Sequence, residues 1–290
     1  MKIIHTPYNA QAEYKEVQQF LIDLFESTGN FANWLPTRFE NSHTNDDADI
    51  EIWRLEKKII GMTTKEGKNH FFLHLDENHI RLLDDMLQYI EWRAIQLDLS
   101  QVMVHCLEGE RIREQGLIKR GYRNQGVDGI IRVRDLDFEV PNDQQLPVGY
   151  KIIELTDEWV DSYAEAIRIV FGHSYFTGEI VQAIRSASFY RQDLDLLAID
   201  AEGKIASFIT YRMDPLTNYV ELEPLGTLPN HRGLGLAEIL INEGYKRLQK
   251  YKPRLIYIGG AANTPAANRV YEKTGFFGVS NENKWVKDLV

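Results

Sequence analysis

The sequence predicts an α+β fold with a mixed α/β sheet, arranged as two tandem domains. Three observations support this prediction. Short apolar runs with strand character alternate along the chain with longer runs at helical spacing. A polar, proline-containing segment divides the chain near its middle. The order of the predicted elements in the first half parallels the order in the second half, which indicates a tandem duplication.

The segment Asp137–Gly149 is the most linker-like part of the chain. Its sequence, DFEVPNDQQLPVG, has two prolines, a polar middle and neither helical nor strand periodicity. Composition shifts of this kind mark domain boundaries. We therefore predict a first domain over residues 1–137, a linker over 138–148 and a second domain over 149–290.

In the second half, strands and helices are predicted in the order β-α-α-β-β-β-α-β-α-β-β. Asp157 is placed to cap the first helix, and Phe276–Leu289 is predicted to form a closing hairpin. The other predicted strands are Tyr150–Leu155, Leu194–Asp200, Ile205–Met213, Tyr219–Thr227 and Leu255–Ile258, and the predicted helices are Asp157–Phe171, Gly178–Ala187, Gly235–Gln249 and Thr264–Thr274.

The first half follows a similar order with weaker signals. Both halves contain the succession of strand, helix, strand and short helix, and in both halves the short helix ends near a glycine followed by an aromatic residue. The predicted helices are Ala12–Ser27, His79–Leu97 and Arg111–Lys119, and the predicted strands are Ile50–Leu55, Lys58–Thr64, His70–Leu75, Gln101–Cys106 and Val127–Leu136.

Composition excludes several classes of function. The formal net charge is −10, and an acidic surface repels phosphate backbones, so we expect no nucleic-acid partner. The single cysteine, Cys106, lies in an apolar strand and is predicted to be a buried, inert thiol. No run approaches the roughly 18 apolar residues of a transmembrane helix. We therefore expect a cytoplasmic protein with no membrane partner. The sequence is compatible with either a monomer or a homodimer.

A glycine-rich loop between a strand and a helix carries the clearest chemical signal. Its sequence is Arg232-Gly233-Leu234-Gly235-Leu236-Ala237. The glycines allow a tight turn, the first amides of the following helix lack intrahelical partners, and the helix dipole favours an anion there. An ordinary helix entry is the alternative reading. The loop matches [QR]-x-x-G-x-[GA] and neither the Walker pattern nor the Rossmann pattern.

At this point the sequence resembles the GNAT acetyltransferase superfamily. The loop pattern is that of the family's acetyl-CoA pyrophosphate loop, and A-x(3)-Y-x(3)-G-F from Ala267 to Phe276 resembles the family's last helix and the turn after it. The resemblance covers about 150–290. The run Glu-Pro-Leu-Gly-Thr before the loop is similar to a subset of bacterial tandem-GNAT proteins. The resemblance implies two tandem GNAT-like acyl-CoA N-acyltransferase domains and acetyl-CoA as cosubstrate.

The resemblance also implies the cofactor contacts. Gly233 and Gly235 shape the loop and Arg232 adds a cation at its entrance. Backbone amides would bind the pyrophosphate, backbone groups of the strand end would pair with the pantetheine arm, and Asn268 would line the channel. The amides are those of Leu234, Leu236, Ala237, Glu238 and neighbouring residues, and the strand-end groups are those of Gly226, Thr227 and Leu228.

The expected reaction is direct attack of a small-molecule amine on the thioester. Glu223 or Glu221, two residues apart on one strand, is the candidate general base, with Glu223 favoured. The alternative is a pair of solvated strand carboxylates. The resemblance places Tyr271 near the sulfur, as the acid that protonates the departing thiolate. Its alternative role is packing beneath the sheet.

The first half has no glycine at the position equivalent to the loop. There, Asp76 and Glu77 suit the helix dipole as caps but would repel a pyrophosphate. We therefore expect a degenerate first domain that does not bind the cofactor. The spacing of the histidines matches no metal motif, so no metal is predicted. Two alternatives to the N-acetyltransferase remain: a non-catalytic acyl-CoA-binding sensor, or an acyltransferase with another acyl group or a hydroxyl acceptor.

Overall fold

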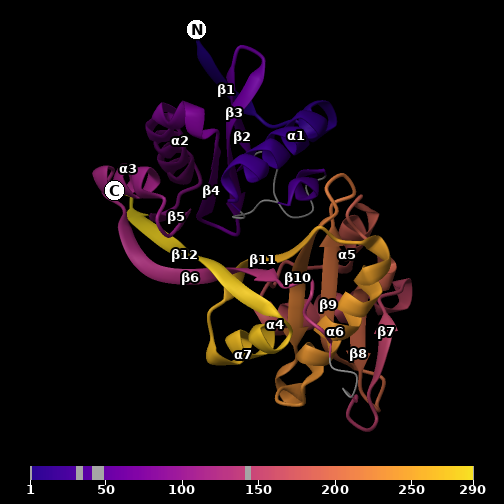
Figure 1. Ribbon diagram of the computed structural model, residues 1–290. Coiled ribbons are helices and arrows are strands. Elements are labelled where there is room, and N and C mark those ends of the chain that lie inside the picture. The colour runs from indigo at the N-terminus through magenta and orange to yellow at the C-terminus, as the bar shows by residue number, and fades with distance from the viewer. Residues whose placement is uncertain (1, 31–34, 41–48, 141–144, 290) are drawn as a thin grey trace. The chain divides into compact units, whose positions relative to one another are not determined.

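The computed structural model describes residues 2–30, 35–40, 49–140 and 145–289, which form two compact units (Figure 1). The first unit comprises Met1–Ile131, Gly259–Asn263 and Gly278–Val290, and the second comprises Arg132–Ile258 and Thr264–Phe277. The compact units are therefore discontinuous in sequence, unlike the predicted domains 1–137 and 149–290. Residues 141–144 of the predicted linker 138–148 lie outside the described residues.

The first unit begins with a strand and a helix, continues with three successive strands, and then alternates between helices and strands. Its elements are β1 (Ile3–Pro7), α1 (Ala10–Thr28), η1 (Pro36–Phe39), β2 (Glu51–Leu55), β3 (Lys58–Glu66), β4 (His70–Leu75), η3 (Glu77–Leu82), α2 (Leu83–Gln96), β5 (Gln101–Leu107), α3 (Arg111–Lys119), most of β6 (Arg123–Arg134) and most of β12 (Phe276–Asp288).

The second unit likewise has three successive strands after its first helices, and it contains the glycine-rich loop. Its elements are β7 (Lys151–Glu154), η4 (Asp157–Trp159), α4 (Val160–Phe171), α5 (Gly178–Ser186), η5 (Gln192–Leu194), β8 (Asp195–Ile199), β9 (Ile205–Met213), β10 (Tyr219–Thr227), η6 (Pro229–His231), α6 (Leu236–Leu248), η7 (Gln249–Tyr251), the first half of β11 (Leu255–Ala262) and α7 (Pro265–Lys273).

The prediction of an α+β fold with mixed pairing is confirmed within each unit. In the first unit β4 pairs parallel with β5, while β1, β2, β3 and β4 pair antiparallel in succession. In the second unit β10 pairs parallel with β11 and antiparallel with β9. A parallel pair needs a crossover connection, and α2 and α6 supply the two crossovers.

Each unit has its own apolar core. In the first, alternate residues of β4 and β5, such as Phe71 and Val104, pack against Leu87 and Ile90 of α2. In the second, Phe208 of β9 packs with Tyr163 and Ile167 of α4. Alternation along the strands directs the remaining side chains to the opposite face, where polar groups can gather.

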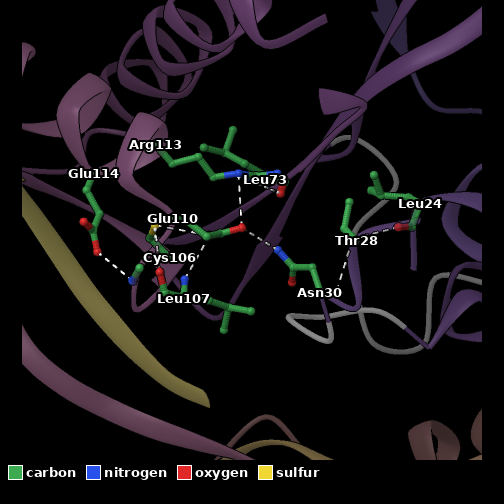
Figure 2. A network of polar contacts seen from close by, with 10 residues as sticks. Leu24, Thr28, Asn30, Leu73, Cys106, Leu107, Glu110, Arg113 and Glu114 are labelled. Carbon is green, nitrogen blue, oxygen red and sulfur yellow. Dashed lines mark hydrogen bonds and ion pairs between the residues drawn. The ribbon is translucent and has the colours of Figure 1, made fainter. Parts of the chain in front are cut away.

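Cys106 is buried, as predicted, within a polar network centred on Glu110 (Figure 2). Glu110 Oε2 accepts hydrogen bonds from the Leu107 amide over 3.0 Å and from the Cys106 thiol over 3.3 Å. Its Oε1 accepts from Asn30 Nδ2 over 3.0 Å and lies 3.4 Å from Arg113 Nε. Burial and the Glu110 carboxylate raise the pKa of the thiol, which therefore stays protonated and poorly nucleophilic.

Two local predictions were wrong, and one strand was missed. Phe276–Asp288 is one strand and not a hairpin, because residues 282–288 pair with β5, a partner distant in sequence. Asp157 does not cap its helix, because its carboxylate accepts hydrogen bonds from Arg185 and Gln182. The strand Ile3–Pro7 went unpredicted and pairs with β2. No helix in the described part of the chain is long and apolar enough to cross a membrane.

Candidate active site

The glycine-rich loop ends at an uncapped helix N-terminus. Gly233 and Gly235 have φ values of 79° and 76°, a backbone conformation that side-chain-bearing residues rarely adopt. Gly235 is the N-cap of α6, and no side chain caps this helix. The first intrahelical bond runs from Ile239 N to Gly235 O over 3.1 Å. The amides of Leu236, Ala237 and Glu238 precede it and point out of the helix end.

The strand leading to this loop is irregular at the predicted catalytic residues. Between Leu222 and Leu225, β10 has one residue more than the facing part of β9, so the register shifts there. The parallel ladder with β11 extends from Tyr219 to Glu221. Beyond the bulge, Gly226 lies opposite Phe208, where a Cβ would come within 2.3 Å of the Phe208 ring. Glycine is therefore required at position 226.

The backbone groups at the end of β10 differ in their availability. Leu228 N donates to Ala206 O and Leu228 O accepts from His231 N, each over 2.9 Å. Both backbone groups of Leu228 thus have partners within the protein. Thr227 O accepts from Arg232 Nε over 3.2 Å. Because successive strand residues direct their amides to opposite edges, the Thr227 amide faces away from β9.

Tyr271 lies in a buried environment shaped by α7 and β6. Its residue is 8% exposed, and the Arg132 guanidinium carbon lies 5.5 Å from the centre of its ring. Burial raises the pKa of Tyr271 to about 12, with the Arg132 charge acting in the opposite direction and the Glu223 carboxylate in the same direction. Arg132 Nη2 also donates to Asn268 Oδ1 over 2.7 Å. The structure therefore brings Tyr271, Asn268 and Glu223 into one neighbourhood.

The two strand carboxylates have different surroundings. Glu221 is 2% exposed and lies opposite Arg212 in the β9–β10 register. The side chain of Glu223 is 41% exposed, and its Oε1 lies 3.6 Å from Nη1 of the same arginine. The Arg212 side chain is itself buried and lies over the Phe189 ring. Only Glu223 combines contact with this cation and access to solvent.

A cavity of about 480 Å³ lies beside the strand end. One side is α4, with Asp161, Glu165 and Arg168, and the other side includes Lys204 and Leu228. Two carboxylates and two cations line it, so its charge favours neither a cationic nor an anionic occupant.

Comparison with known proteins identifies the region that contains these features. Residues 155–276 match the family model described as the acetyltransferase (GNAT) family. This segment is a GNAT acetyltransferase domain. The match runs from just after β7 to the start of β12, so the loop, both glutamates and Tyr271 all lie within the GNAT domain. The family supports acyl transfer as the activity of this domain.

Solved structures extend the likeness to nearly the whole chain. A tandem GNAT protein from the clavulanic acid biosynthesis pathway, determined without AcCoA, has a TM-score of 0.75 at 15% identity, covering 99% of this chain and 98% of that one. A GCN5-related N-acetyltransferase from Sphaerobacter thermophilus has a TM-score of 0.72 at 15% identity, covering 99% and 95%.

A GNAT-family acetyltransferase from Colwellia psychrerythraea has a TM-score of 0.67 at 12% identity, covering 99% of each chain. Such identities show the fold, here that of two GNAT-like domains in tandem. A search of curated proteins gives no match to the sequence.

Sequence reasoning missed two arginines beside the candidate site. Arg132 comes from β6, before the predicted linker, and Arg212 from β9. Both are buried. A signal was present in the sequence, since Ile130-Ile131-Arg132-Val133-Arg134 places two charges in an apolar strand. Buried charges are costly unless compensated, so such a pattern indicates a functional or structural site.

Proposed function

We propose that this protein transfers the acetyl group of acetyl-CoA to an amine of a small molecule, by direct attack of the amine on the thioester. The observation that carries the proposal is the uncapped N-terminus of α6, within a domain of the GNAT family.

The α6 N-terminus suits the pyrophosphate of coenzyme A. The amides of Leu236, Ala237 and Glu238 precede the first intrahelical hydrogen bond, and the helix dipole adds partial positive charge. Gly233 and Gly235 keep side chains away from the approaching phosphates. The Glu238 carboxylate, which would oppose an anion, lies 3.5 Å from Lys273 Nζ and is partly neutralised. Arg232 and the Leu234 amide extend the same site.

The end of β10 suits the pantetheine arm and the thioester. The Thr227 amide faces away from β9 and is a donor for a pantetheine carbonyl or the thioester oxygen. Gly226 leaves the strand surface beside it without a side chain. Leu228 would act through its side chain, because its amide and carbonyl already have partners.

Glu223 and Tyr271 divide the proton transfers. Glu223, through water, takes a proton from the attacking amine while nitrogen bonds to the acyl carbon. As the carbon–sulfur bond breaks, Tyr271 gives its hydroxyl proton to the sulfur and later regains one from solvent. A pKa of about 12 keeps Tyr271 protonated at neutral pH, as an acid must be. Arg132, beside the ring, stabilises the negative charge that develops there.

Calorimetric titration with acetyl-CoA, joined to a thiol-release assay over a panel of polyamines, aminosugars and amino acids, tests this function. We expect acetyl-CoA binding and amine-dependent thiol release. If acetyl-CoA binds but no amine causes thiol release, the protein is a non-catalytic acyl-CoA sensor and not an enzyme. Release with only longer acyl-CoAs, or only with alcohols, would change the acyl group or the acceptor. No binding of any acyl-CoA would refute the proposal.

A further inference from the structure

Two histidines and a carboxylate from three strands lie close together in the first unit. His70 lies on β4, His105 on β5 and Asp128 on β6. One potential ligand atom from each lies within 4.8 Å of the other two. The prediction that the protein binds no metal rested on the spacing of histidines along the sequence. That spacing could not reveal this cluster, because its three residues come from three different strands.

The distance between the two histidines is close to that of two ligands on one metal ion. His70 Nδ1 and His105 Nε2 are 2.8 Å apart. Zinc binds imidazole nitrogen at about 2.0–2.1 Å, so two tetrahedral nitrogen ligands lie roughly 3.3 Å apart. The two nitrogens, now at hydrogen-bond distance, would have to move apart by about 0.5 Å, and the rings would have to turn so that both lone pairs point at an ion beside the line that joins them.

Two neighbours of His105 restrict the rotation of its ring and the position of its proton. Glu282 Oε2 lies 3.4 Å from His105 Nδ1, on the side of the ring away from His70. A carboxylate there favours the proton on Nδ1 and leaves the lone pair on Nε2, which faces the cluster. Phe72 stacks on the same ring at 4.8 Å between centroids, which restricts its rotation. Buried ligands with a carboxylate behind them are a recurrent arrangement in metal sites.

One group opposes a metal at this place. Lys284 Nζ donates to Asp128 Oδ1 over 2.7 Å. An ammonium beside the cluster repels a cation and competes for the carboxylate. It occupies one oxygen of Asp128, and the carboxylate retains a second. Lys284 therefore opposes metal binding through its charge, and a variant without this charge should bind the metal more tightly.

We propose that His70, His105 and Asp128 form a binding site for a borderline divalent metal ion such as Zn²⁺. Two imidazoles and one carboxylate favour zinc over magnesium or calcium, which prefer oxygen ligands. Three protein ligands leave one tetrahedral position for water or an exogenous ligand. On binding, the proton of His70 Nδ1 moves to Nε2 so that both facing nitrogens offer lone pairs. The site is independent of the proposed acyl transfer.

The test is titration of the full-length, EDTA-treated protein with Zn²⁺ by calorimetry and with Co²⁺ by visible absorption. We expect one equivalent of each ion to bind, and Mg²⁺ not to bind. His70→Asn and Asp128→Asn should each weaken Zn²⁺ binding at least about tenfold. His79→Asn, which changes a histidine outside the cluster, should match wild type. Circular dichroism and the thermal midpoint check that each variant is folded.

Lys284→Met supplies the decisive control, because it should tighten Zn²⁺ binding, a gain that misfolding cannot produce. Absence of stoichiometric Zn²⁺ binding would overturn the proposal. Unchanged affinity in the folded His70→Asn and Asp128→Asn variants, or in Lys284→Met, would do the same.

Discussion

Arg132 in β6 donates a hydrogen bond of 2.7 Å to Asn268 in α7, across 136 residues of sequence. The same guanidinium lies beside the Tyr271 ring. One buried cation from the strand before the predicted linker thus orders two residues of the last helix. Its charge also opposes the rise in the pKa of Tyr271 that burial causes.

Removal of the Arg132 charge should slow the acyl transfer that we propose. We expect Arg132→Met to lower kcat about tenfold or more, because the charge that develops near Tyr271 loses its nearest cation. Arg132→Lys should retain part of the rate. Arg113→Met removes a buried arginine of the first unit that donates to Leu73 O. An equal loss of rate in that variant would mean that Arg132 acts through stability alone.

A side chain at Gly235 should abolish coenzyme A binding. Gly235→Leu places a bulky group at the mouth of α6 and strains a residue with φ of 76°. We expect calorimetry to show acetyl-CoA affinity reduced at least about 100-fold, since several amide contacts are lost together. Gly67→Leu is the matched control, with φ of 58° and open space around it. If Gly235→Leu binds acetyl-CoA with wild-type affinity, the N-terminus of α6 is not the pyrophosphate site.

Loss of the Tyr271 hydroxyl should affect turnover and not binding. We expect Tyr271→Phe to lower kcat about 10- to 100-fold, the scale of a lost general acid, with acetyl-CoA affinity within about threefold of wild type. Tyr122→Phe removes the hydroxyl of another buried tyrosine, in the first unit, and should leave kcat unchanged. Stopped-flow thiol release measures the effect. A normal rate in Tyr271→Phe would leave the tyrosine with a packing role.

Substitutions of the two strand glutamates should have different effects, one on kcat and the other on thermal stability. Glu223→Gln keeps the side-chain shape but cannot accept a proton, so we expect kcat to fall about 100-fold near neutral pH. Glu221→Gln, at a position 2% exposed, should act mainly on the thermal midpoint. The pH–rate profile distinguishes a base from a structural carboxylate, because only loss of the base removes the acidic limb. The reverse pattern would make Glu221 the base.

The raised pKa of Asp195 should make the stability of the folded protein depend on pH. Burial raises its pKa from 3.8 to about 7, with the hydrogen bond from Thr210 acting in the opposite direction. Between these values the folded chain binds more protons than the unfolded chain, so stability falls as pH rises from about 4 to about 7.

Asp195→Asn cannot ionise and should escape this fall. We expect the free energy of unfolding of the variant, relative to wild type, to increase by about 2 to 4 kcal/mol between pH 4 and pH 7. Urea unfolding at a series of pH values measures the difference. Asp137→Asn, at an exposed position, should run parallel to wild type. A difference for Asp195→Asn that does not change with pH would contradict the shifted pKa.

The sequence by itself determined the α+β fold, the glycine loop and the helix after it, because these depend on local period and on the backbone freedom of Gly233 and Gly235. Tandem organisation also followed, since both halves repeat the same order of elements. The same local reasoning failed at Asp157, where partners 25 and 28 residues away compete successfully for the carboxylate.

Features that depend on contacts between residues distant in sequence were decided only by the tertiary structure. It turned Phe276–Asp288 into a strand paired with β5, placed Arg132 beside Tyr271, and brought His70, His105 and Asp128 together from three strands. Strand pairing is set by non-local hydrogen bonds and by burial of whole faces, which no window of sequence contains. For that reason the conformation of the loop could be predicted from neighbouring residues, whereas the charges around the site could not.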